Sequence, residues 1–208
     1  MNRKKILIAL ISLFVVTVFF TVLQQTQKQD VRIYLEEPDI TVSIYREGGD
    51  GSPVHTLSTS STISLPEGPY AAVPSGEKAD STPIRFNVGD ETSTVSINPP
   101  YRASYLSQVL EGEKNSLHNV ITNEFPSIIS EYDINTGSLF QKGEWYGTVL
   151  SYDSSDPREE RDTYRVVLKQ TESGDWAIAA GPEIVLTSFK YPDVPLSVLV
   201  ETNTLLID

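Results

Sequence analysis

The residue types that most often carry catalysis or bind metals are few and scattered in this chain of 208 residues. Its two histidines, His55 and His118, stand 63 positions apart, and neither has a partner at metal-ligand spacing. A zinc or related site needs several convergent ligands, so each histidine is interpreted as an isolated surface residue. No cysteine occurs, which excludes disulfides, thiolate metal sites and thiol catalysis. Serine is common, but no Gly-x-Ser-x-Gly motif surrounds any serine. We therefore expect no catalytic residue, no metal and no cofactor.

Acidic groups offer the next candidates. The stretch 153–162 holds five carboxylates, which could bind Ca²⁺. However, Pro157, Arg158 and Arg161 interrupt any alternating ligand pattern and no glycine supports a sharp turn, so we interpret the stretch as a solvated loop. The pair Glu131 and Asp133 is explained equally well by solvation at a strand end.

Large aromatic side chains are the remaining candidates, because strands expected in the C-terminal half carry several of them. Rings on one face of a sheet form either the lining of a pocket for an apolar ligand or peptide, or part of the core. Aromatics at alternating strand positions usually face a core. The set comprises Tyr146 and Tyr152 and, as the principal candidates, Trp145, Tyr164 and Trp176.

The formal net charge of −12 argues against a nucleic-acid partner, since a binder must neutralise phosphates with clustered basic side chains. By contrast, residues 6–23 form an unbroken run of 18 residues without charge, about the minimum for a membrane-spanning helix. Basic residues at 3–5 precede it, so we expect a cytoplasmic N-terminus and an exported remainder in a single-pass membrane protein. The alternative, a cleaved signal peptide, has a shorter apolar stretch and a small-x-small site, which this run lacks. The exported part carries 13 basic and 28 acidic residues, a net charge of −15.

Between residues 31 and 97 the chain alternates short β-rich runs with turn residues, which is typical of an antiparallel sandwich or barrel. The expected strands are 31–35, 40–45, 54–57, 62–65, 70–73, 83–88 and 94–97. The run Leu65-Pro66-Glu67-Gly68-Pro69-Tyr70 resembles the Leu-Pro-x-Gly-x-Tyr core of PEGA-like surface domains, which are small β-sandwiches related to the carboxypeptidase regulatory fold. The stretch 86–97, with Gly89-Asp90 as its turn, is similar to the closing strands of that family. The chain departs from the family at 56–59, where the Gly-x-Thr-Pro step is missing.

After Pro99 and Pro100 the pattern changes to two amphipathic helical stripes, at 101–110 and 117–125, with a break near Gly112. Strands at 145–152, 164–170 and 176–179 follow, and 183–186 is a candidate for a fourth. The apolar tail 196–207 is expected to pack back on the sheet as a helix or strand. This order resembles NTF2-like and cystatin-like domains, in which a long helix lies in the concave face of the sheet.

Taken together, the predicted organisation is an N-terminal transmembrane helix, then an all-β sandwich, then an α+β domain with helices packed on an antiparallel sheet. Residues 1–30 hold the cytoplasmic stub, anchor and linker, residues 31–98 the PEGA-like sandwich and residues 99–208 the NTF2-like part. Because the chain shows no reactive constellation, the first hypothesis is that it is a non-catalytic protein that binds an extracytoplasmic protein or envelope component. It would contact the lipid bilayer through residues 6–23. The alternative is a small-ligand or enzymatic pocket in residues 101–187.

Overall fold

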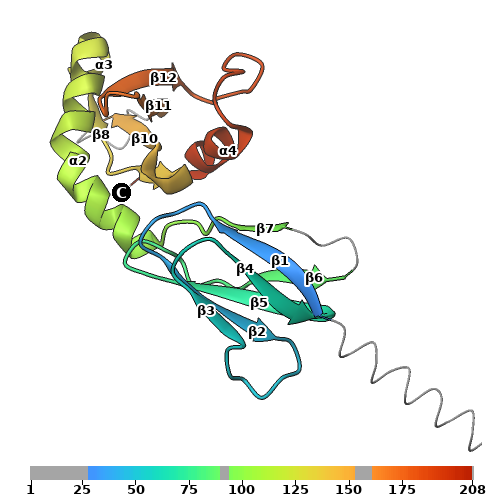
Figure 1. The fold of residues 1–208 in the computed structure, drawn as a ribbon. Coiled ribbons are helices and arrows are strands. Elements are labelled where there is room, and N and C mark those ends of the chain that lie inside the picture. Colours follow the sequence, from blue (N-terminus) through green and yellow to red (C-terminus); the bar gives the residue numbers. More distant parts are fainter. Residues whose placement is uncertain (1–27, 90–93, 153–160, 208) are drawn as a thin grey trace, which may run out of the picture. The chain divides into compact units, whose positions relative to one another are not determined.

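The computed structural model describes residues 28–89, 94–152 and 161–207, which fall into two compact units divided between Pro99 and Pro100. Among the described residues, both units consist mainly of β-sheet, and all the helices belong to the second (Figure 1). Within the described ranges, no helix combines the length and apolar character needed to cross a bilayer. The anchor predicted at 6–23 lies outside these ranges.

The described residues of the first unit form seven strands, one at each of the positions expected from the sequence. They are β1 (Lys28–Leu35), β2 (Thr41–Arg46), β3 (His55–Leu57), β4 (Ser61–Pro66), β5 (Gly68–Ser75), β6 (Ile84–Val88) and β7 (Thr94–Ile97). Two sheets result, with strand orders β4-β1-β7 and β3-β2-β5-β6. Every pair is antiparallel except β1 and β7, which are parallel.

One core joins the two sheets, because each strand turns alternate apolar residues inward. Val31 and Ile33 of β1 are fully buried together with Val42 and Ile44 of β2, which belongs to the other sheet. Burial of each such side chain stabilises the folded state by roughly 1.5–3 kcal/mol. Polar residues between them face solvent, which fixes the register of each strand.

The turn between β4 and β5 has the geometry that its sequence implies. Gly68 adopts φ +135°, a value that favours glycine. Two residues later, the ring of Tyr70 is buried in the core and its hydroxyl donates a hydrogen bond of 2.8 Å to the Pro66 carbonyl. The tyrosine therefore ties the turn to the core with both its apolar ring and its polar tip.

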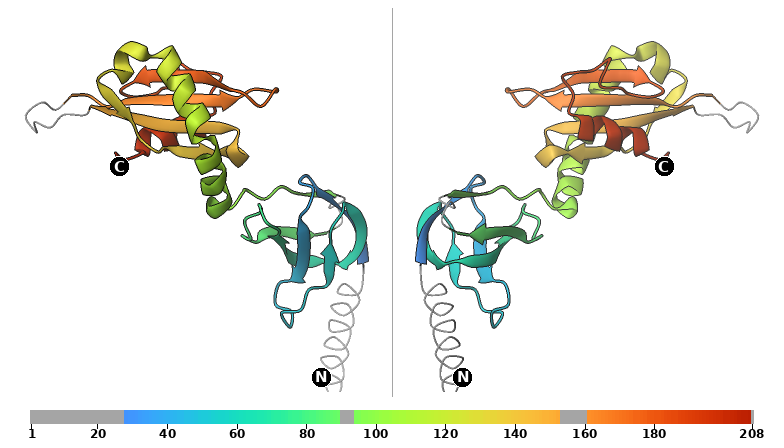
Figure 2. Two further views of the ribbon diagram at one scale, coloured as in Figure 1. Left: turned by 90° about the vertical axis from the view of Figure 1, so that its left-hand side faces the viewer. Right: turned by 90° about the vertical axis from the view of Figure 1, so that its right-hand side faces the viewer.

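The second unit is one antiparallel sheet with a helix on each face. Its elements are α2 (Ala103–Glu124), α3 (Pro126–Ile129), β8 (Tyr132–Ile134), β9 (Ser138–Phe140), a 3₁₀ turn (Gln141–Gly143), β10 (Trp145–Tyr152), β11 (Tyr164–Gln170), β12 (Trp176–Glu183) and α4 (Leu196–Thr204). The strand order is β12-β11-β10-β8, and β9 also pairs with β10. Figure 2 shows α2 crossing one face and α4 lying on the other.

Separate cores hold the two helices against the sheet. Leu117 and Ile121 of α2 pack on a cluster that includes Tyr146 of β10, whereas Val198 and Leu199 of α4 pack on the opposite face. The sequence predicted the strands at 145–152 and 164–170 with these bounds. It did not predict β8 or β9, each of which has only three residues.

The expected break near Gly112 is wrong, because α2 runs without interruption through 22 residues. A side chain at Gly112 would meet nothing within 4 Å, so this glycine lies on the open side of the helix. A solvent-facing glycine weakens a helix by about 1 kcal/mol relative to alanine, which the burial of Leu110 and Leu117 on the other side outweighs. The helix ends at Glu124, just before Pro126, as predicted.

Candidate functional site

The three aromatic candidates do not share one face of the sheet. Consecutive strand residues point to opposite faces, so Trp145 and Tyr146 of β10 belong to different cores. Trp176 lies in the core beneath α2 with Tyr146, and Tyr164 packs against that core. Trp145 lies in the core beneath α4. The expectation of a common face is therefore wrong for Trp145.

Both tryptophans are packed as core residues. Trp176 is 6 % exposed, and its indole Nε1 donates a hydrogen bond of 3.1 Å to Oε2 of Glu113 on α2. Trp145 is 5 % exposed, with the Lys169 ammonium 5.2 Å from the centre of its ring. Each ring thus fills a helix–sheet interface, Trp176 beneath α2 and Trp145 beneath α4.

The two histidines occupy different units and different environments. His55 lies on β3 of the first unit, and His118 lies on α2 of the second. Burial, with a smaller contribution from Lys114, lowers the pKa of His118, and its Nε2 atom finds no hydrogen-bond partner among the described residues. Across residues 28–89, 94–152 and 161–207, no group of three or more His, Cys, Asp or Glu side chains is arranged to hold a metal ion.

The expectation that the chain also lacks a Ser-x-x-Lys motif is wrong, because Ser75-Gly76-Glu77-Lys78 has this spacing, which some acyl-transfer enzymes use. Ser75 ends strand β5, and its hydroxyl donates a hydrogen bond to the Thr41 carbonyl on β2. Residues 76–83 form no helix that would bring Lys78 beneath the serine. Of the acidic loop considered for Ca²⁺, residues 153–160 lie outside the described ranges.

The described residues of the second unit line a cleft beside α2 and β9 and another beside β8. The α2–β9 cleft has a volume of about 300 Å³, and its lining includes Leu106, Leu110, Glu111 and Leu139. The β8 cleft has a volume of about 270 Å³, and it is lined by residues 129–133 and Tyr152. None of the three principal aromatic candidates lines either cleft.

Among the described residues of the second unit, the large apolar side chains that are exposed all lie in its C-terminal segment. We use the term C-terminal apolar surface for its seven large exposed apolar side chains. They are Ile184, Val185, Phe189, Leu196, Val200, Leu206 and Ile207. Phe189 is 97 % exposed and Leu206 is 84 % exposed, values that are unfavourable for side chains of this size in water.

Specific contacts hold this segment in place. Asn203 of α4 bonds the backbone of Leu186 twice, accepting from its N–H at 2.9 Å and donating to its carbonyl at 2.8 Å. This pair fixes the start of the segment beside the end of α4. Because Leu196 and Val200 are four positions apart, they share one exposed face of that helix.

The sequence predicted that the tail packs back on the sheet, which is confirmed, but it did not predict the exposed surface. A signal was available: the first half of α4 carries Leu196 and Val200 in addition to the buried Val198 and Leu199, so its apolar residues are not confined to one face. A helix that needs only one face to pack usually has a polar opposite face.

Comparison with protein-family models, curated proteins and solved structures finds no match to this chain. The resemblances to PEGA-like and NTF2-like domains therefore stay predictions.

Proposed function

We propose that this chain is a non-catalytic, membrane-anchored protein whose extracytoplasmic part binds another protein of the cell envelope. The observation that carries the proposal is the C-terminal apolar surface. Seven large apolar side chains are exposed within 24 consecutive residues, in a unit whose tryptophans are both buried. Large apolar side chains left exposed in one short segment are favourable sites for a partner to cover, since covering them removes apolar area from water.

The contacts that hold the surface favour a binding role. The backbone of Leu186 is fixed by Asn203, and α4 is held by a core of its own. A prearranged surface loses less conformational entropy on binding than a loose tail does. Phe189 and the Leu196–Val200 pair would supply the apolar anchors of such an interface.

Membrane anchoring belongs to the same proposal and rests on sequence. Residues 6–23 would cross the bilayer with the N-terminus in the cytoplasm, because the basic residues lie on that flank. The two units would then stand outside, the first as a PEGA-like β-sandwich and the second as an NTF2-like α+β domain. The single core between two sheets supports the first assignment, and the long α2 helix across one sheet face supports the second.

The test is to disrupt the surface without disturbing the fold. Val200→Asp places a charge at a position that is 52 % exposed, so folding should be unaffected while a partner interface would lose affinity. Val54→Asp is the matched control, since Val54 is 45 % exposed in the first unit. Full-length protein is extracted from its native membranes in mild detergent, and the mass of its complexes is measured.

We expect wild type and Val54→Asp to migrate in the same complex and Val200→Asp to migrate alone. Two differently tagged copies, co-expressed, distinguish a foreign partner from a second copy of this chain. If Val200→Asp stays in the complex, the surface is not the binding site.

A second candidate function, small-ligand binding, is favoured by the α2–β9 cleft. Its volume of about 300 Å³ is at the lower end for small-molecule sites, and leucines from α2 and β9 line it beside Glu111. A ligand there would be a small apolar molecule. Leu106→Trp should fill the cleft and abolish binding of such a ligand while leaving the mass of the complex unchanged.

A further inference from the structure

Three tyrosines meet where β8 pairs with the end of β10. Tyr132 and Tyr152 are cross-strand partners, with ring centroids 5.6 Å apart and an edge-to-face geometry. Tyr164 of β11 adds a third ring, 5.2 Å from that of Tyr132. Tyr132 is the most buried of the three. The pKa of its hydroxyl is raised, mainly by burial and next by the neighbouring Tyr164. The rings therefore form a fixed aromatic platform at the edge of the sheet.

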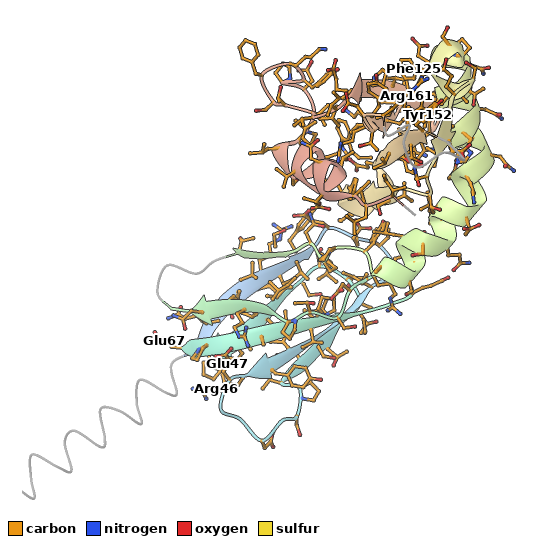
Figure 3. All side chains as sticks on the ribbon, turned by 180° about the vertical axis from the view of Figure 1, so that it is seen from behind. Arg46, Glu47, Glu67, Phe125, Tyr152 and Arg161 are labelled. Carbon is orange, nitrogen blue, oxygen red and sulfur yellow. The ribbon has the colours of Figure 1, made fainter. Side chains whose placement is uncertain are left out.

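This platform already holds one cation, the guanidinium of Arg161. Its Cζ atom lies 4.1 Å from the centre of the Tyr152 ring; both residues are labelled in Figure 3. Its Nη1 atom bonds the carboxylate of Glu131. A ring face and a carboxylate are the two groups that a planar guanidinium binds best at once. The corner formed by Glu131 and Tyr152, which we call the guanidinium corner, thus has the chemistry of an arginine-binding site.

Arg161 is held there only loosely. Its side chain is 47 % exposed and that of Glu131 is 52 % exposed. Ion pairs and cation–π contacts at such exposure are weak, because water and salt compete for both partners. A second guanidinium could therefore replace the first.

The β8 cleft gives an incoming group room to approach the corner. Glu131, Tyr132 and Tyr152 belong to the lining of this cleft, and Asp133 adds another carboxylate. The chain as a whole is acidic, with a net charge of −12, which favours a basic ligand over an acidic one.

We propose that the guanidinium corner binds an arginine side chain of a basic polypeptide, and that Arg161 is an internal occupant which this arginine displaces. Arginine is favoured over lysine because its flat guanidinium stacks on the ring while its N–H groups bond the carboxylate. The proposal is separate from the C-terminal apolar surface, with which it shares no residue.

The experiment is a titration of full-length protein in zwitterionic detergent, with tyrosine rings isotopically labelled and observed by NMR. The probe is a neutral-ended peptide, acetyl-Gly-Ser-Arg-Ser-Gly-amide, and its lysine counterpart is the comparison ligand. Arg161→Gln removes the internal occupant, so it should bind the arginine peptide about fivefold more tightly than wild type, a change of ~1 kcal/mol. The lysine peptide should bind more weakly to both proteins.

Arg85→Gln is the matched control, because it also removes one positive charge. Arg85 forms an exposed 2.9 Å ion pair with Glu47 in the first unit. This variant should leave the affinity at the wild-type value. Adding Glu131→Gln or Tyr152→Leu to Arg161→Gln should abolish the gain in affinity for the arginine peptide. Because Glu131 is exposed, Glu131→Gln should not unfold the protein, so it provides the test if the Tyr152 variant does unfold. Equal gains in Arg161→Gln and Arg85→Gln, or a gain that survives Glu131→Gln, would overturn the proposal.

Discussion

Gly147, in the middle of β10, allows α4 to approach the sheet closely. A Cβ atom at this position would lie 2.2 Å from Oγ1 of Thr202 and 2.8 Å from Cε2 of Phe140. Thr202 is fully buried and Phe140 is 9 % exposed, so neither side chain can move into solvent. We therefore predict that Gly147→Ala forces α4 away from the sheet.

The expected magnitude follows from two opposing effects. Adding a methyl group to a packed core costs about 1–3 kcal/mol, whereas replacing glycine by alanine in a strand recovers about 0.5–1 kcal/mol. The contacts at Gly147 are short enough to place the cost at the upper end, which leaves a net loss of about 2 kcal/mol. In a domain of about 100 residues this lowers Tm by roughly 10 °C.

Tryptophan fluorescence during urea unfolding of residues 28–208 measures the effect selectively, since the two tryptophans of the chain, Trp145 and Trp176, both belong to the second unit. Gly112→Ala is the matched control: the same chemical change on the open side of α2 should stabilise the protein by up to about 1 kcal/mol. Adding Thr202→Ala to Gly147→Ala should recover part of the loss. If Gly147→Ala is as stable as Gly112→Ala, the close packing of α4 is refuted.

Three further outcomes are expected. Trp176→Ala should lower the free energy of unfolding by about 3–5 kcal/mol. Trp176→Phe should lower it by less, because this change loses mainly the hydrogen bond to Glu113. If Trp176→Ala leaves the stability nearly unchanged, the ring is not part of the core. The pKa of His118 is lowered in the folded state, so at a pH just below the ordinary histidine pKa of about 6.5 this side chain binds a proton more readily in the unfolded chain. The free energy of unfolding should therefore fall as the pH drops through about 6.5. His118→Gln should flatten that part of the pH profile, and an unchanged profile would assign the dependence to other groups. Val15→Arg should block membrane insertion, with a cost of about 2.5–3.5 kcal/mol at the centre of the span; carbonate-resistant membrane association of this variant would contradict the anchor.

Strand positions were the most predictable part of this fold. In the first unit, alternating pairs such as Val31 and Ile33 can bury only one face, so the sequence determines both the strand and its register. The continuous α2 helix was not predictable from local signals, because Gly112 weakens the helix locally and only the packing of Leu117 and Ile121 on the sheet compensates. Strands β8 and β9 are too short to show a period, and their pairing with β10 determines them.

The candidate site was less predictable than the fold. Adjacent Trp145 and Tyr146 cannot point to one face of a strand, so their separation was readable from the sequence. The C-terminal apolar surface depends on which side of α4 the sheet covers, which is a tertiary choice. The β8–β10 pairing brings Glu131 close to Tyr152 in the guanidinium corner. Arg161 bonds Glu131 across 30 positions of sequence, and no spacing rule gives such a contact.

The measurement that tests the central claim most directly is photo-crosslinking in intact cells. A benzophenone amino acid replaces Val200 in the full-length chain, and a second variant carries it at Val54, which is similarly exposed in the first unit. If the C-terminal apolar surface binds an envelope protein, irradiation should give one discrete adduct from position 200 and none from position 54, and Leu196→Asp should remove it. No adduct from position 200, or the same adducts from both positions, would contradict the account.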